Sequence, residues 1–433
     1  MSIAPQIAMI LLSVALLIVA MVVVRRVGQR YAWSAELQRK GVHLATGAYA
    51  LMLPWIFSER WPVLVIAGMA VLVLLLMRTP VLAKSGLGAT LHSVERHSYG
   101  DLLLAVSVGV VFFFSHGNPV LYVLPIAVVT LSDAAAALTG VRYGRSFFNT
   151  ETGRKSFEGS AMFFMVTWIV AMILLLLMTE IDRENVVLLS LVVAAFGTLV
   201  EADSWHGFDN LFLPVALHLF LAGHLETEPV RLLELTLLFL AVLAVVLALA
   251  PRLGLSDHTA RVYTIAVFGI YVVTDVHNAV LPVTAILAHL AARHMRPCRS
   301  RYPDLDVLAM VVLISVLWLF LGRYADQNAL NMYDLSFAGS ALVFIALAAG
   351  SRRWIAVVAA GTLAAAVVAT TYRNPEAAHW HGPLWPWIAM SFLLCLAVPL
   401  LKADLLDRYR GPRVVTIALS VPLAAFLTKV FLS

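Results

Sequence analysis

Residues 132–144 read SDAAAALTGVRYG, and residues 153–160 read GRKSFEGS. An aspartate closes one long apolar run here, and a lysine and a glutamate three residues apart precede the next. Charged residues make up 13% of the 433-residue chain, against about 25% in an ordinary soluble domain. Charges gathered between two apolar runs therefore need an explanation, as a structural pair or as a functional site.

Apolar residues account for 61% of the chain and occur in successive runs separated by short charged segments. Since a membrane-spanning helix needs about 20 apolar residues, we predict an all-α polytopic membrane protein with about 14–16 transmembrane helices. Residues 1–250 are predicted to form one membrane-embedded domain, which contains the charged clusters. Residues 251–433 are predicted to form an additional multi-span domain without a comparable polar cluster.

Basic residues mark the side of the membrane that each loop faces. The first helix is followed by a group that predicts a cytoplasmic loop: Arg25, Arg26, Arg30, Arg39 and Lys40. Counting helices from there places residues 25–40, 78–100, 140–159 and 201–210 on the cytoplasmic face. The net charge of +5 comes mainly from such loops, and no basic stretch is interleaved with aromatic residues, so we expect no nucleic-acid partner.

Three groups of residues carry candidate chemistry, each with a structural alternative. Asp133 ends an apolar run, where an ionised carboxylate needs a cation, either an arginine side chain or Mg²⁺. Lys155 and Glu158 are expected on one face of a helix starting near Ser156, as a phosphate site or as a helix cap.

Two further groups lie at the ends of other apolar runs. Glu201, Asp203 and Asp209, with Asn210, form either a divalent-cation site or a solvated loop. In the first loop, Arg39 and Lys40, with His43 one helical turn after Lys40, either bind phosphate oxygens or anchor the helix at the membrane surface.

Together these motifs resemble the membrane polyprenol kinase family, which includes dolichol kinase, phytol kinase, farnesol kinase and the CTP-dependent diacylglycerol kinase. The resemblance covers residues 25 to about 225 and rests on four segments in order. They are Glu36-x-x-Arg39-Lys40-x-x-His43-x-x-x-Gly47; Val94-Glu95-Arg96-x-Ser98-Tyr99-Gly100; Asp133-x-x-Ala136-x-x-x-Gly140-x-x-x-Gly144 with Lys155-Ser156-x-Glu158-Gly159-Ser160; and Glu201 with Gly207-x-Asp209-Asn210-Leu211-x-x-Pro214. Ala134 departs from the pattern, because many members carry glycine or proline directly after the aspartate.

The resemblance implies transfer of the γ-phosphate of CTP, with Mg²⁺, to the hydroxyl of a lipid alcohol of the polyprenol, dolichol, phytol or farnesol type. The implied partners are this alcohol and the surrounding membrane lipids. The resemblance implies that the metal ligands are Asp133, Glu158, Asp209 and Asn210. It implies that the nucleotide is bound by Arg39, Lys40, His43, Gly140, Gly144, Lys155, Ser156 and Gly159. For catalysis it implies Lys155, with Glu201 or Asp203 as the proton acceptor.

Two other functions fit parts of the same pattern. A membrane cytidylyltransferase that forms a CDP-activated lipid would use the same carboxylates and metal. A lipid transporter would account for the number of helices and for the polar residues Asp275, His277 and Asn278, although transporter charges usually lie deep in the helices.

Overall fold

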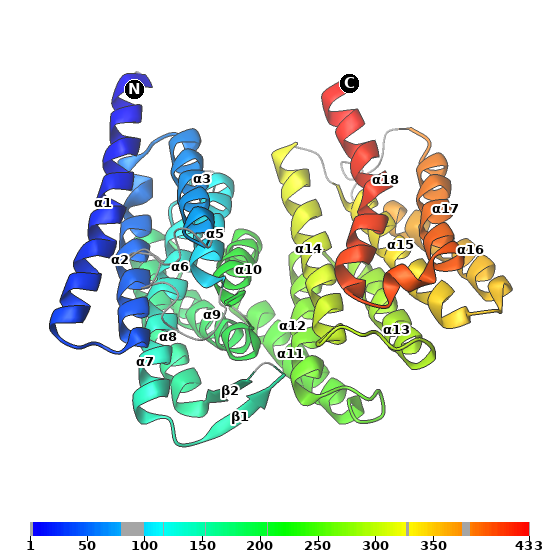
Figure 1. Ribbon diagram of the computed structural model, residues 1–433, viewed down its shortest axis with the longest axis horizontal. Coiled ribbons are helices and arrows are strands. Elements are labelled where there is room, and N and C mark those ends of the chain that lie inside the picture. Colours follow the sequence, from blue (N-terminus) through cyan, green and yellow to red (C-terminus); the bar gives the residue numbers. More distant parts are fainter. Residues whose placement is uncertain are drawn as a thin grey trace. The chain divides into compact units, whose positions relative to one another are not determined.

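Helices make up most of the computed structural model, which describes residues 3–78, 99–115, 117–151, 153–205, 207–325, 329–374 and 382–432 (Figure 1). Among these residues, nine helices are long and apolar enough to cross a membrane, and three shorter helices are also apolar. The prediction of an all-α polytopic membrane protein is thereby confirmed. The chain forms two units, Met1–Leu238 and Phe239–Ser433, whose boundary lies within helix α11 (Pro229–Leu249).

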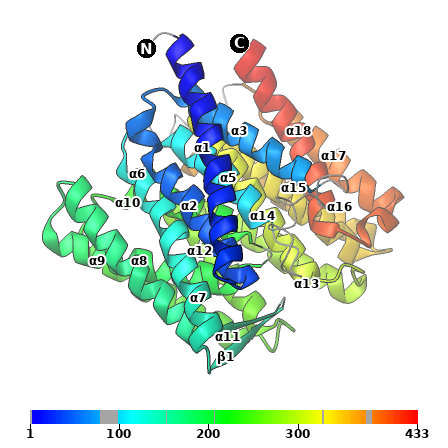
Figure 2. The same ribbon diagram turned by 60° about the vertical axis from the view of Figure 1, so that its left-hand side comes forward.

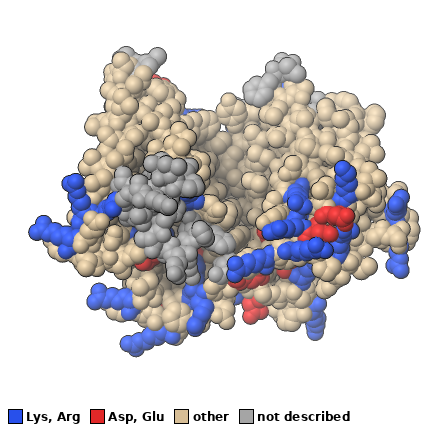
Figure 3. All heavy atoms as spheres, viewed as in Figure 1, with Lys and Arg blue, Asp and Glu red and all other residues tan. Residues whose placement is uncertain are grey.

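The N-terminal unit surrounds one buried span, Val120–Tyr143. The elements of this unit before α11 are α1 (Ile3–Arg30), α2 (Ala35–Ile56), α3 (Arg60–Met77), α5 (Gly100–Phe114), α6 (Val120–Ala127), η1 (Val128–Ser132), α7 (Asp133–Tyr143), β1 (Phe147–Thr150), β2 (Gly153–Ser156), α8 (Phe157–Met178), α9 (Arg183–Asp203) and α10 (Asp209–His224). Helices α8 and α9 pack side by side (Figure 2). In Figure 3, Lys and Arg side chains of this unit gather toward the end that carries the β-hairpin.

A π-helical turn, η1, interrupts the buried span directly before Asp133. It packs against α2, α8 and α10, so three helices meet where the π-turn lies. Such turns are rare and occur frequently at functional sites. The turn also places the carbonyl oxygen of Val129 within 3.0 Å of Nε2 of His43 on α2.

Glycines let α7 and α8 approach each other at backbone distance. A Cβ atom added to Gly140 would lie 2.9 Å from Oγ of Ser156, and one added to Gly159 would lie 3.0 Å from the carbonyl oxygen of Ala136. The expected cap is present, since Oγ of Ser156 accepts a hydrogen bond from the Gly159 N–H at 3.1 Å. The helix begins at Phe157, one residue after this cap.

The loop between α7 and α8 contains an antiparallel hairpin that the sequence analysis did not predict. Strands β1 and β2 pair Phe147 with Ser156 and Phe148 with Lys155. Lys155 therefore lies in a strand and not in the first turn of α8, so it does not share a helix face with Glu158. Residues 79–98, which belong to a segment expected on the cytoplasmic face, lie outside the described residues.

The C-terminal unit is built around α15. Its elements after α11 are α12 (Asp257–Val273), η2 (Val276–Ala279), α13 (Val280–Met295), α14 (Pro303–Tyr324), α15 (Leu330–Ala349), α16 (Arg353–Arg373), α17 (Trp385–Leu401), η4 (Ala403–Leu406) and α18 (Arg410–Leu432). Helix α15 contacts α13, α14, α16, α17 and α18. Two polar side chains of this unit, Asn278 and Asn374, hydrogen-bond to each other in both directions, at 3.0 and 3.2 Å.

The close approach of α7 and α8 predicts the effect of one added methyl group. Gly159→Ala should destabilise the protein by about 1–3 kcal/mol, because the new Cβ atom meets a backbone carbonyl that cannot move away easily. The thermal unfolding midpoint of purified protein in detergent measures this effect. Gly68→Ala is the matched control, since a Cβ atom there meets nothing within 4 Å; an equal midpoint for the two variants would contradict the prediction.

Candidate active site

Lys40 and Asp133 form a buried ion pair at the start of α7. Nζ of Lys40 lies 2.5 Å from Oδ2 of Asp133, and neither side chain has more than a small exposed area. His43 lies on the same side of α2, with Nε2 3.6 Å from the same carboxylate oxygen. Because an unpaired buried charge costs several kcal/mol, each residue of the pair makes burial of the other tolerable. The structure thus joins the N-terminal part of α2 to the Asp133 segment.

Lys155 and Glu201 form a second pair, between β2 and the last turn of α9. Nζ of Lys155 lies 2.6 Å from Oε1 of Glu201, and it also donates to the backbone carbonyl oxygen of Glu201. Desolvation alone would lower the pKa of Lys155, but the carboxylates of Glu201 and Asp209 raise it above its ordinary value. Lys155 is therefore held in its charged form.

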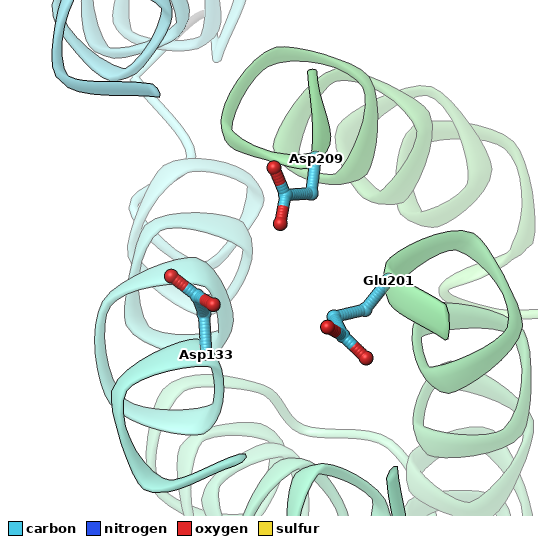
Figure 4. A group of neighbouring side chains, drawn as sticks. All are labelled: Asp133, Glu201 and Asp209. Atoms are coloured by element: carbon cyan, nitrogen blue, oxygen red, sulfur yellow. The ribbon is translucent and has the colours of Figure 1, made fainter. Parts of the chain in front are cut away.

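Three carboxylates from three helices converge (Figure 4), and two of them are the partners of these lysines. Asp133 of α7, Glu201 of α9 and Asp209 of α10 each offer one oxygen atom, and these atoms lie within 4.8 Å of one another. Oδ1 of Asp209 is buried and accepts no hydrogen bond from the described residues. Burial and the nearby Asp133 raise the pKa of Asp209 to about 6, although Lys155 opposes this effect. The two lysines thus leave part of the negative charge uncompensated.

This group fits a divalent cation that prefers oxygen ligands. Two oxygen atoms on opposite sides of Mg²⁺ lie about 4 Å apart, so separations of up to 4.8 Å are only slightly wider than the ion requires. Asn210 follows Asp209 in the first turn of α10, and its Oδ1 is also buried without a hydrogen-bond partner among the described residues. The fit therefore rests on both the donor type and the orphaned oxygen atoms.

Other residues named from the sequence lie outside the three-carboxylate group. Arg39 pairs with Glu36 on its own helix at 2.7 Å. Glu158 accepts a hydrogen bond from the Ser146 N–H at 3.0 Å and so closes the hairpin loop. Asp203 is buried at the end of α9 but contributes no atom to the group.

The glycines expected at the nucleotide have visible packing contacts. Gly140 and Gly159 lie at the contact between α7 and α8, and a Cβ atom added to Gly144 would meet the carbonyl oxygen of Gly140 and Cβ of Ser156. The same glycines thus bring the hairpin and both helices together. This packing positions Lys155, because β2 leads directly into α8.

Two hydroxyl groups of the π-turn did not enter the predicted site. Oγ1 of Thr130 and Oγ of Ser132 are buried, and neither has a hydrogen-bond partner among the described residues. Polar residues immediately before an aspartate, inside an apolar run, were the available signal. The Val94–Ser98 part of the second family motif lies outside the described residues.

Comparison with known proteins adds one relationship to this geometry. No family model and no solved structure matches the chain. A phytol kinase of Synechocystis sp. (strain ATCC 27184 / PCC 6803 / Kazusa) is 34% identical over 185 residues, which are 42% of this chain and 76% of the relative. The chain belongs to the polyprenol kinase family. At the level of that family, the protein is a membrane kinase whose phosphate acceptor is an alcohol.

The three-carboxylate group predicts cation binding that needs no nucleotide. Purified protein should bind Mn²⁺, a spectroscopic substitute for Mg²⁺, and Asp209→Ala should weaken this binding at least about tenfold. Electron paramagnetic resonance of free Mn²⁺ measures the affinity. Asp182→Ala removes an exposed carboxylate at the start of α9 and serves as the matched control. Equal affinity in the two variants would contradict the assignment of Asp209.

Proposed function

We propose that this protein transfers the γ-phosphate of CTP to the hydroxyl of an isoprenoid alcohol, at the cytoplasmic face of the membrane and with Mg²⁺. The convergence of Asp133, Glu201 and Asp209 between two lysines is the observation that carries the proposal. The similarity to a phytol kinase supports an isoprenoid alcohol of the phytol type as the acceptor. The basic loop after α1 supports the cytoplasmic placement.

The proposed roles follow from what phosphoryl transfer requires. Such reactions depend on positioning and charge neutralisation more than on covalent chemistry. Asp133 and Asp209, with Asn210 next to Asp209 in the sequence, would hold Mg²⁺, which when bound neutralises charge on phosphate oxygens. Lys40 and Lys155 lie against these carboxylates and supply positive charge toward the triphosphate.

The remaining step is removal of the proton from the alcohol. The last turn of α9 carries two carboxylates, Glu201 and Asp203, and we assign the proton acceptor to one of them. Both lie at the end of a membrane-length helix. A lipid alcohol also exposes its hydroxyl group at the membrane surface. The hydroxyl group and CTP would therefore meet while the hydrocarbon chain of the alcohol stays in the membrane.

Isotope transfer distinguishes this function from its alternatives. Purified protein is incubated with phytol, farnesol, a long polyprenol or diacylglycerol and with CTP labelled at the α or the γ phosphate. We expect label from the γ position in the lipid product, with phytol among the accepted alcohols. Label from the α position would indicate a cytidylyltransferase, and absence of label from every lipid would return transport to consideration.

The role of Lys155 predicts a defect in turnover. Lys155→Met should lower kcat by about 100-fold or more, since it removes a charge aimed at the reacting phosphates. Phosphorylation of phytol measures kcat, and the unfolding midpoint shows whether the variant is folded. Arg154→Met is the matched control, because Arg154 is exposed on the same strand with its guanidinium group 4.9 Å from the centre of the Phe147 ring. Wild-type kcat in folded Lys155→Met would exclude this role.

A further inference from the structure

A long apolar groove lies between α1, α2, α3 and α5 of the N-terminal unit. Its volume is about 1030 Å³, a figure that includes the solvent space at its open side. Among the described residues that line it, three have polar side chains, Thr46, Tyr49 and Asp101. The groove therefore suits a ligand that is almost entirely hydrocarbon.

One end of the groove adjoins the candidate active site through α2. Val42 and Thr46 line the groove, and His43 between them lies 3.6 Å from the Asp133 carboxylate. The Thr46 hydroxyl donates to the carbonyl oxygens of Val42 and His43, which fixes it at this end. Asp101 also lines the groove and lies near enough to act electrostatically on Arg39 and His43. Polar groups thus lie where the groove meets the charged cluster.

The other end extends along the helices, away from that cluster. Lining residues on α2 run from Val42 to Leu53 and those on α3 from Leu74 back to Val63, which is about 16 Å at 1.5 Å per residue. This length is about half of the roughly 30 Å hydrocarbon core of a bilayer. The groove is therefore long enough for a chain of limited length and too short to enclose a long polyprenol.

We propose that this groove binds the isoprenoid chain of the alcohol substrate, with the hydroxyl at the Thr46–Asp101 end and the tail toward Leu53 and Val63. The inference rests on the proposed function and extends it to the length of the alcohol. The alanines Ala67, Ala70 and Ala105 widen the groove along its length. That width accommodates the methyl branches of an isoprenoid chain, which an unbranched acyl chain lacks.

Filling the groove provides the functional test. Ala70→Phe and Ala105→Phe should raise KM for phytol at least about tenfold, because the pocket loses space for several methyl and methylene groups. They should leave phosphorylation of prenol, a single isoprene unit, unchanged, since a short alcohol needs only the polar end. Leu72→Phe is the matched control, because Leu72 is exposed on α3 and does not line the groove.

Two kinetic outcomes would overturn the proposal. One is an unchanged KM for phytol in both groove variants. The other is an equal loss of activity toward phytol and prenol in variants that keep the wild-type unfolding midpoint. If the wild-type protein phosphorylates no alcohol at all, the proposed function fails, and the groove is then judged by binding alone.

Photolabelling supplies that separate measurement. A phytol analogue with a diazirine on its chain should label peptides of α3 and α5, and excess phytol should remove the label, whereas palmitic acid should not. Ala70→Phe should lose this labelling and Leu72→Phe should keep it. Labelling elsewhere, or labelling that palmitic acid removes equally well, would show occupation by ordinary membrane lipid and overturn the proposal.

Discussion

The N-terminal unit holds three carboxylates close together in spite of their mutual repulsion, and the rest of the site depends on this constraint. Two carboxylates 4.8 Å apart repel each other by roughly 3 kcal/mol at an effective dielectric constant of about 20, and three such groups converge here. Two lysines offset part of this energy, each paired with one carboxylate. A bound cation would offset the rest. Because the packing of apolar helices holds the carboxylates together, it creates a site with affinity for positive charge.

The architecture supplies each charge from a different kind of element. Asp133 follows a π-turn, Glu201 ends a membrane-length helix, Asp209 starts a shorter one, and Lys155 stands on a strand. The strand matters because successive side chains of a strand point to opposite faces. Lys155 can therefore reach Glu201 while Arg154 stays in contact with Phe147 at the surface.

Sequence reasoning identified the charged members of the site because charges at the ends of apolar runs are rare. Asp133, Lys155, Glu201 and Asp209 all stood out in this way, and three of the four predicted cytoplasmic segments meet in the structure. The sequence does not show which of these charged residues form ion pairs, since Lys40 and Asp133 are 93 residues apart. The hairpin was missed because its strands are only four residues long and too polar to show a pattern. The packing contacts of the glycines depend on how α7 and α8 meet, which periodicity alone does not reveal.

The π-turn has a consequence for how α7 is oriented about its own axis. Each residue of an α-helix advances the chain by about 100°, and a π-turn contains one residue more than an α-helical turn. Deleting one residue within Val128–Ser132 would leave a continuous apolar helix of nearly the same length but rotate α7 by roughly 100° relative to α6. Asp133 would then turn away from Lys40, and Gly140 away from α8. One additional residue thus sets the rotation of α7 about its axis relative to α6. The hydrophobicity and the length of the span do not reveal this rotation.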